Sequence, residues 1–334
     1  MLSDKIKKII EDLIKQQWYT KLTWLWLLYP LSILFWIIIY IRRKILCFRA
    51  SYYKHPHVWI VGNIAVGGSG KSPFIIWLST FLEENNIRFA VVGHGYKNKL
   101  QVNAAECFKD SDPKIFGDEA VMLSHKISAP IVVGKSRIDA LDYITKNFPT
   151  LDLVICDDGL QDYRIKRQKE IVIINDASLG NRCCLPVGPL REPLSRVRES
   201  DLVLTHEYDT NTDMQLEFNE IINMKTGHKL DKDALNGMHV NALAAIAHPD
   251  RFFNMIENLG AIATKRALPD HCFFTSNDFK FENNNPILIT EKDSVKLRGI
   301  NTANIYVVTT KLIVSTRVKD ILTSYLSDRV ITSA

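Results

Sequence analysis

The fold of this chain is decided by the stretch Val58-Trp-Ile-Val-Gly-Asn-Ile64 and the residues that follow it, Ala65-Val-Gly-Gly-Ser-Gly-Lys-Ser72. An apolar run that ends in a glycine-rich turn with lysine and serine predicts a buried strand, a phosphate-binding loop and a helix. Compared with the pattern G-x-x-x-x-G-K-[ST], only the first glycine is replaced, by Ala65. The other glycines still let backbone N–H groups face phosphate oxygens at the start of the helix.

Residues 65–72 are the candidate ATP-binding loop. Lys71 would reach the β- and γ-phosphates as a catalytic cation, and the Ser72 hydroxyl would bind Mg²⁺. The alternative is a glycine-rich turn with a chance lysine, against which the strand-loop-helix context argues. No [NT]-K-x-D sequence occurs, so adenine is expected rather than guanine. The loop comprises Ala65, Val66, Gly67, Gly68, Ser69, Gly70, Lys71 and Ser72.

A later buried run supplies the acidic groups that such a site needs. Leu153-Val-Ile-Cys156 is followed by Asp157, Asp158 and Gly159. Carboxylates at the end of a strand suit Mg²⁺. One of the two would bind the ion, and the other would orient the ion or share in binding it. Taken alone, an aspartate pair is also common in ordinary turns. Beside the phosphate loop, it predicts a metal site.

Short apolar runs alternate with helical periodicity along the body, which predicts an α/β fold with a doubly wound, mostly parallel sheet of the P-loop NTPase type. A second, smaller α/β series follows a polar, weakly periodic connection at 209–238. The expected strands are 58–64, 89–92, 130–133, 153–156, 171–174, 202–204, 241–247, 262–265, 287–290 and 305–308. The expected helices are 72–84, 119–126, 138–148, 251–259 and 318–326. The expected parts are an N-terminal segment (1–54), a P-loop domain (55–208), a connection (209–240) and a C-terminal α/β domain (241–334).

Charge is unevenly distributed along the 334 residues. Residues 1–54 carry ten basic and three acidic side chains, whereas the remainder carries 32 basic and 34 acidic ones. A nearly neutral body argues against a nucleic-acid-binding surface. The mean hydropathy of −0.04 excludes a polytopic membrane protein.

The N-terminal region combines two patterns typical of membrane association. Residues 2–15 have the spacing of a basic amphipathic helix, and residues 22–41 contain no charge over a length that could cross a bilayer. Pro30, several aromatic side chains and basic residues on both flanks favour a helix that lies on the cytoplasmic face of a membrane. A single spanning helix is the alternative.

Six motifs occur along the chain in a fixed order. They are Gly62-Asn-Ile-Ala-Val-Gly-Gly-Ser-Gly-Lys-Ser-Pro73, Gly117-Asp-Glu119, Asp157-Asp-Gly-Leu-Gln161, Gly188-Pro-Leu-Arg-Glu-Pro193, Pro269-Asp-His271 and Thr290-Glu-Lys-Asp293. This series resembles that of the tetraacyldisaccharide 4′-kinases, the lipid A 4′-kinase family of Gram-negative bacteria. The resemblance extends from the N-terminal segment to about residue 298. A series of motifs is far more specific than the phosphate loop alone.

The resemblance implies transfer of the γ-phosphoryl of ATP, with Mg²⁺, to the 4′-hydroxyl of a tetraacyldisaccharide 1-phosphate. The implied partners are this acylated substrate and anionic lipid of the bacterial inner membrane, at its cytoplasmic face, and no nucleic acid. The phosphate-loop sequence by itself is also compatible with two other functions. They are a kinase of a soluble metabolite and a membrane-tethered nucleotide-dependent switch.

The resemblance also implies roles for residues outside the loop. Asp118 would be the base and His271 would assist it, although alone they suggest a helix N-cap and a structural histidine. Glu119 would contact the metal, or merely favour the helix N-terminus. Arg191 and Glu192 are assigned to substrate binding, because a guanidinium grips phosphate bidentately, with a surface ion pair as the alternative. His94 replaces the family's usual arginine.

Overall fold

The computed structural model describes residues 17–20, 24–93, 99–206, 212–297, 299–300 and 303–332. Dense contacts divide the chain into two units. Unit 1 comprises residues 1–71, 147–215 and 314–334, and unit 2 comprises residues 72–146 and 216–313. The chain therefore passes between the units four times.

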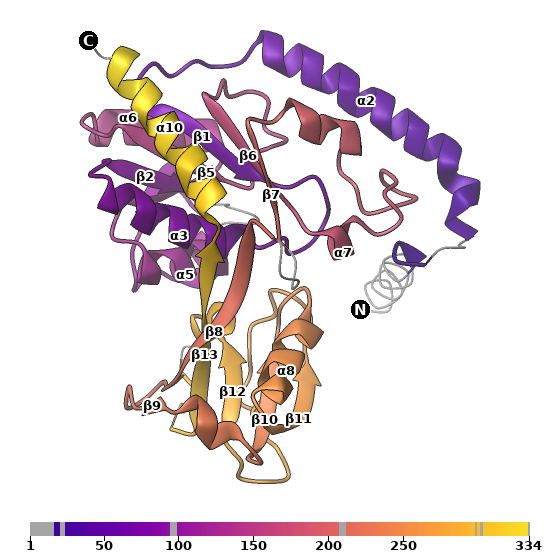
Figure 1. Cartoon of the computed structure of the whole chain (residues 1–334), viewed down its shortest axis with the longest axis vertical. Helices are drawn as coiled ribbons and strands as arrows, with labels where there is room; N and C mark the ends of the chain where they lie inside the picture. Colours follow the sequence, from indigo (N-terminus) through magenta and orange to yellow (C-terminus); the bar gives the residue numbers. More distant parts are fainter. Residues whose placement is uncertain are drawn as a thin grey trace. The chain divides into compact units, whose positions relative to one another are not determined.

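Unit 1 contains a parallel sheet with the strand order β5-β1-β6-β7 (Figure 1). Strands β1 and β5 are almost fully buried, which explains why they are continuous apolar runs rather than alternating ones. In their parallel register, Val61 is opposite Asp157, so the loops that follow the two strands leave from the same edge of the sheet. The strands are β1 (His57–Gly62), β5 (Leu153–Asp157), β6 (Lys169–Ile174) and β7 (Leu202–Thr205).

The last helix of the chain, α10 (Thr316–Thr332), belongs to unit 1. The hydroxyl of Tyr325 donates to the carbonyl of Asp201 at 2.7 Å, and its ring meets Trp59 edge-on at 6.1 Å. These contacts fix the helix against the residues of β1 and the start of β7. Two short helices complete the unit, α7 (Asp176–Leu179) and the 3-10 helix η2 (Leu194–Glu199).

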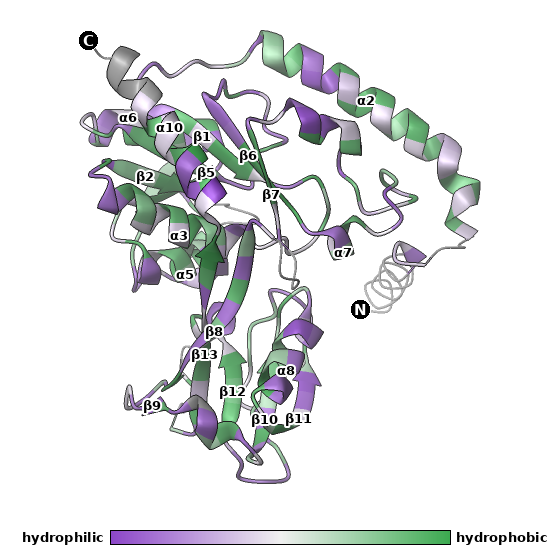
Figure 2. Ribbon diagram, in the orientation of Figure 1, coloured by the Kyte–Doolittle hydropathy of each residue, from purple (hydrophilic) through white to green (hydrophobic). Residues whose placement is uncertain are grey.

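The N-terminal apolar segment forms the 3-10 helix η1 (Trp24–Leu28) and helix α2 (Tyr29–Phe48), with Pro30 in the first turn of α2 where a missing N–H is tolerated. Leu25 is fully buried, and Ser32 Oγ donates to the carbonyl of Cys184 at 2.8 Å. Near the other end, Arg43 pairs with Glu199. Many apolar side chains on the other faces of α2 are exposed. Figure 2 shows the apolar residues along this helix in green. Residues 24–48 are long and apolar enough to cross a membrane.

The first half of unit 2 has the strand order β3-β4-β2, in which β4 pairs parallel with β2 and antiparallel with β3. Gly117, with φ of 91°, separates two helices and allows the second to begin at Asp118. The strands are β2 (Phe89–Val92), β3 (Ala104–Cys107) and β4 (Ile131–Gly134). The helices are α3 (Lys71–Glu84), α4 (Pro113–Phe116), α5 (Asp118–Lys126) and α6 (Arg137–Asn147).

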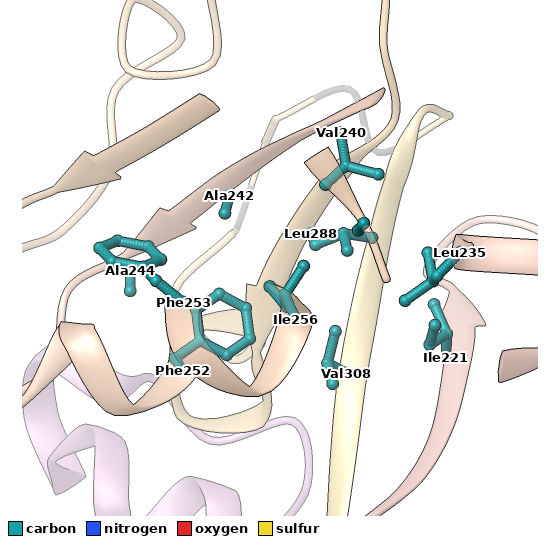
Figure 3. Packing of buried hydrophobic residues seen from close by; sticks show 11 residues of the cluster. Ile221, Leu235, Val240, Ala242, Ala244, Phe252, Phe253, Ile256, Leu288 and Val308 are labelled. Atoms are coloured by element: carbon teal, nitrogen blue, oxygen red, sulfur yellow. The ribbon is translucent and has the colours of Figure 1, made fainter. Parts of the chain in front are cut away.

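The second half of unit 2 is built on a mixed sheet with the order β11-β10-β12-β13-β8-β9. Phe252, Phe253 and Ile256 of α8 pack on the sheet around Leu288 and Val308 (Figure 3). The strands are β8 (Met214–Asn223), β9 (Lys229–Leu230), β10 (His239–Ala244), β11 (Ile262–Ala267), β12 (Ile287–Thr290) and β13 (Ile305–Val314). The helices are η3 (Lys232–Leu235), α8 (Pro249–Asn258) and α9 (Glu291–Ser294).

The structure confirms the predicted strands and helices of both α/β series, with shifts of a few residues at their ends except for β13 and α10, which are longer. The connection expected at 209–238 is wrong over residues 214–223, which form β8. Met214, Leu216 and Phe218 alternate with Gln215, Glu217 and Asn219, and this period of two gives the segment one face for packing.

Some predictions are not decided by this arrangement. The domain boundaries after residues 54, 208 and 240 stay a prediction. The amphipathic helix expected at 2–15 and the position of His94 lie outside the described residues.

Candidate active site

The phosphate loop leaves β1 and pairs with residues 189–191. Val66 N donates to the carbonyl of Pro189 at 2.9 Å, and Arg191 N donates to that of Ile64 at 2.7 Å. Gly70 has a φ of 89°, and a Cβ on it would lie 2.8 Å from His206 Nδ1. Both the conformation and the space therefore require glycine at position 70.

Asp158 joins two cations beside this loop. Lys71 Nζ lies 3.2 Å from its Oδ1, and Arg191 Nη1 lies 3.1 Å from its Oδ2. Asp158 has a φ of 48°, in the left-handed region that costs a non-glycine residue on the order of 1 kcal/mol. Asp157, one residue earlier, is buried at the end of β5. The structure thus brings together Lys71, Asp158 and Arg191, from three separate motifs.

Two buried oxygens at the loop lack a hydrogen-bond partner within the part of the chain that the structure describes. They are Asn63 Oδ1, just before the loop, and Ser69 Oγ, inside it. A buried polar atom without a partner costs about 1–3 kcal/mol. Such atoms at a glycine-rich loop are suited to a polar ligand.

Glu192 lies in a buried cluster behind Arg191. It is only 2% exposed, accepts a hydrogen bond from the Tyr163 hydroxyl, and lies 3.6 Å from Arg196 Nε. Burial, together with Glu192, raises the pKa of Tyr163, and burial also raises the pKa of Glu192. Substrate contact by Glu192 stays a prediction, while these contacts support the loop that carries Arg191.

Unit 2 contains a separate group of candidate residues, in which Asp118 meets His271. His271 Nδ1 is 3.0 Å from both carboxylate oxygens of Asp118. An ionised carboxylate only accepts hydrogen bonds, so Nδ1 is the donor. Asp118 begins α5, and His271 follows β11 with a φ of 59°. The structure therefore joins the two residues of the predicted base pair across 153 positions of sequence.

Electrostatics keep Asp118 ionised. Burial would raise its pKa, yet the hydrogen bond from His271 and the nearby Lys292 and Lys296 lower it to about 2. The same hydrogen bond raises the pKa of His271, against the opposing effect of burial. At neutral pH this carboxylate can accept a proton from a hydroxyl group held in contact with it.

Two lysines with no role in the sequence-based predictions, Lys292 and Lys296, lie near the Asp118–His271 pair. Lys292 Nζ lies 3.1 Å from Glu119 Oε1 and 3.6 Å from Asp270 Oδ1. Burial opposes the charge of Lys292, but Glu119, Asp118 and Asp270 raise its pKa above the ordinary value. Lys296 approaches Asp118 from a fully buried position. Both lie in or just after the motif 290–293, so the motif was visible in sequence although its contacts were not.

The raised pKa of His271 predicts a pH-dependent contribution to stability. The ion pair with Asp118 needs protonated His271, so its stabilisation is complete below the unfolded-state pKa of about 6.5. It is lost as pH rises through the higher folded-state pKa. His271→Gln should therefore lower the free energy of unfolding more at about pH 5.5 than at about pH 9 in urea titrations. Exposed His228, replaced by Gln, is the control; an equal loss at both pH values would contradict the assignment.

The comparisons with known proteins now decide the family. The family model Tetraacyldisaccharide-1-P 4′-kinase matches residues 24–327. The chain belongs to this family. A tetraacyldisaccharide 4′-kinase of Coxiella burnetii is 41% identical over 284 residues, which cover 84% of each chain. One of Methylobacillus flagellatus is 39% identical over 294 residues, covering 85% of this chain and 86% of the relative.

A solved structure extends the comparison to the fold. It is the "apo" form of LpxK from Aquifex aeolicus in complex with ATP, 24% identical, with a TM-score of 0.74. The match covers 90% of this chain and 99% of that chain. This likeness confirms the predicted α/β fold class for this member of the family.

Proposed function

We propose that this protein transfers the γ-phosphoryl group of ATP to the 4′-hydroxyl of a tetraacyldisaccharide 1-phosphate, giving the bis-phosphorylated lipid A precursor. The observation that carries the proposal is the Asp118–His271 pair in a chain of the tetraacyldisaccharide 4′-kinase family that also has a phosphate loop. A phosphate loop alone is shared by many classes of protein. A carboxylate oriented by imidazole adds the proton acceptor that transfer to a sugar hydroxyl requires.

The residues beside the loop fit ATP with Mg²⁺. The unpartnered buried Ser69 Oγ lies among the loop's backbone, where phosphate oxygens are bound in such loops. Ser72, Asp157, Asp158 and Glu119 are the oxygen ligands proposed for Mg²⁺, which would neutralise charge on the phosphates. Within the described ranges no group of three or more His, Cys, Asp or Glu side chains is gathered for a metal. Kinases commonly hold Mg²⁺ with one or two carboxylates and the substrate phosphates, so such a group is not required.

In the proposed reaction, Asp118 accepts the proton of the 4′-hydroxyl while the sugar oxygen bonds to the γ-phosphorus. The bond from that phosphorus to the β,γ-bridging oxygen breaks, and ADP leaves. His271 orients Asp118, and Lys71 stabilises negative charge on the phosphates. Arg191, paired with Asp158 in this structure, is proposed to bind a substrate phosphate. Its guanidinium can replace one carboxylate contact by two phosphate contacts.

One assay tests the proposed function. Purified protein is incubated with ATP, Mg²⁺ and the tetraacyldisaccharide 1-phosphate, and the bis-phosphorylated product is measured by mass spectrometry. Product formation, lost in Asp118→Asn, is expected. A product formed only from a water-soluble sugar would favour the soluble-metabolite kinase. Nucleotide hydrolysis without any phosphorylated product would favour the nucleotide-dependent switch.

We also propose that α2 holds the protein on the cytoplasmic face of the inner membrane without crossing it. Leu25, Ser32 and Arg43 contact unit 1 over the length of η1 and α2, which leaves only the opposite faces for lipid. Those faces carry exposed aromatic and aliphatic residues, an arrangement suited to the interfacial region of a bilayer.

Charged substitutions on the exposed side of α2 should detach the protein from lipid. Ile37→Glu combined with Ile41→Glu removes apolar contact and adds negative charge, so binding to phosphatidylglycerol vesicles should fall at least about tenfold. Sedimentation with vesicles measures binding, and ATP affinity should stay unchanged. Phe108→Glu, at an exposed apolar residue of unit 2, is the control. Unaltered vesicle binding by the double variant would refute this placement.

A further inference from the structure

Lys296 occupies an unusual place for a lysine. Its side chain is fully buried, immediately after α9, at the centre of a group of polar atoms in unit 2. Its Nζ lies 2.9 Å from Asp293 Oδ1, 3.1 Å from the carbonyl oxygen of Ala245 and 3.5 Å from Asp118 Oδ2. Asp293 and Ala245 accept hydrogen bonds from this ammonium group, and Asp118 is its second ion-pair partner.

Both carboxylate oxygens of Asp293 accept hydrogen bonds from residues other than Asp118. Its Oδ2 accepts from the backbone N–H of Ala245 at 3.0 Å and from the hydroxyl of Thr290 at 2.8 Å, while Oδ1 accepts from Lys296. This set ties α9 to the end of β10. The interaction of Lys296 with Asp118 is therefore additional to what the buried pair needs for its own neutralisation.

The Asp118 carboxylate is held from three directions. The backbone N–H of Glu119 donates to Oδ1 at 3.0 Å, His271 Nδ1 approaches both oxygens, and Lys296 faces Oδ2. The Lys296 ammonium also lies 5.8 Å from the ring centre of Phe274, three residues after His271. Lys296 thus contacts Asp118 directly and the segment that carries His271 through an aromatic face.

We infer that Lys296 is a positioning residue that fixes the orientation of the Asp118 carboxylate for proton acceptance. The inference rests on the proposed function, in which Asp118 is the base. Because its side chain has no exposed surface, Lys296 does not reach substrate, and it acts on the reaction through its ion pair with Asp118. Replacing a buried ion pair by apolar groups is often neutral for stability, so a buried lysine aimed at a reactive carboxylate is better explained by orientation than by stability.

Lys296→Met tests the inference in steady-state kinetics. Loss of orientation at the reacting group should lower kcat for lipid phosphorylation by roughly 10- to 100-fold, with KM for ATP changed less than about threefold. Lys126→Met is the matched control, because Lys126 of α5 pairs with Glu291 of α9 at 2.5 Å and makes no ion pair with Asp118 among the described residues. Its kcat should remain within about twofold of the wild type.

A double-mutant cycle separates orientation from general damage. If Lys296 acts through Asp118, adding Lys296→Met to Asp118→Ala should lower the residual kcat by less than about twofold. The same factor in both backgrounds, or normal kcat in Lys296→Met, would overturn the inference while leaving Asp118 as the base. Normal kcat in Asp118→Ala would instead contradict the assignment of Asp118 as the base, and the inference with it. Absence of the bis-phosphorylated product with the wild-type protein would contradict the proposed function.

Folding is checked in the same series. Lys296→Met leaves Asp293 buried without its cation, which can prevent folding. The double variant Asp293→Asn with Lys296→Met removes both charges and keeps nearly the same side-chain volume as the wild type. It is used if Lys296→Met alone does not fold. The thermal shift on adding ATP reports an intact nucleotide site. The expected result is the wild-type shift with the same 10- to 100-fold loss of kcat, and a normal kcat would again overturn the inference.

Discussion

Replacing Asp118 with alanine should lower kcat for lipid phosphorylation by about 10²–10⁴-fold, the range typical for removing a general base. The physical reason is the loss of the carboxylate that is hydrogen-bonded to His271 and is proposed to accept the hydroxyl proton late in transfer. ATP affinity should change little, because the phosphate loop belongs to another part of the chain. Product formation at saturating ATP and lipid, followed by radiolabelled phosphate, measures the effect.

Asp118→Asn is the companion variant, since the amide keeps the size of the side chain but accepts a proton poorly. It should be as inactive as the alanine variant. Circular dichroism and ATP-induced thermal shifts establish that both variants fold. If a folded Asp118→Ala enzyme turned over near the wild-type rate, the assignment of the base would be wrong.

Replacing Lys71 with methionine should lower kcat by roughly 10²–10³-fold, comparable to removing one preorganised charge donor from an active site. Methionine keeps most of the length and apolar volume of lysine while removing the ammonium. The loss should appear mainly in kcat, because charge on the transferring phosphoryl group is largest in the transition state. Lys109→Met, at an exposed lysine of unit 2, is the control for a lost surface charge.

A second consequence concerns Asp158. Without Lys71, the carboxylate loses one cation and keeps its ion pair with Arg191. Combining Lys71→Met with Asp158→Asn should therefore fail to restore kcat, while it restores any stability lost through the unpaired charge. An increase in KM for ATP with an unchanged kcat would show that Lys71 contributes only to binding.

Local sequence patterns predicted β1 and β5 because these two parallel strands are buried on both faces. The run 58–64 is apolar apart from Asn63, and the run 153–156 is apolar throughout. The glycines that follow the first run predict a phosphate-binding loop. Strand β3 was not predicted, since the residues 104–107 are few, partly exposed and lack β-branched side chains. Strand β8 was not predicted because polar residues alternate with its apolar ones, so the segment was interpreted as a polar connection.

The candidate site was less predictable than the fold, for a different reason. Asp118 and His271 were assigned through resemblance, because nothing local indicates that residues 153 positions apart are in contact. Nothing in the sequence distinguishes Lys296 from other lysines, and Glu192 was assigned to substrate binding, with a surface ion pair as the alternative. Burial decided the environment of both, and burial depends on the packing of segments that are distant in sequence.

The order in which unit 1 is assembled bears on the biosynthesis of the protein. Its three pieces come from the beginning, middle and end of the chain, and α10 is the last helix to be synthesised. During translation, at about 5–20 residues per second, the apolar α2 is therefore available to lipid well before α10 can close over β1. The unit that carries the phosphate loop can therefore complete its folding only after α10 has been synthesised, when the N-terminal segment can already be at the membrane.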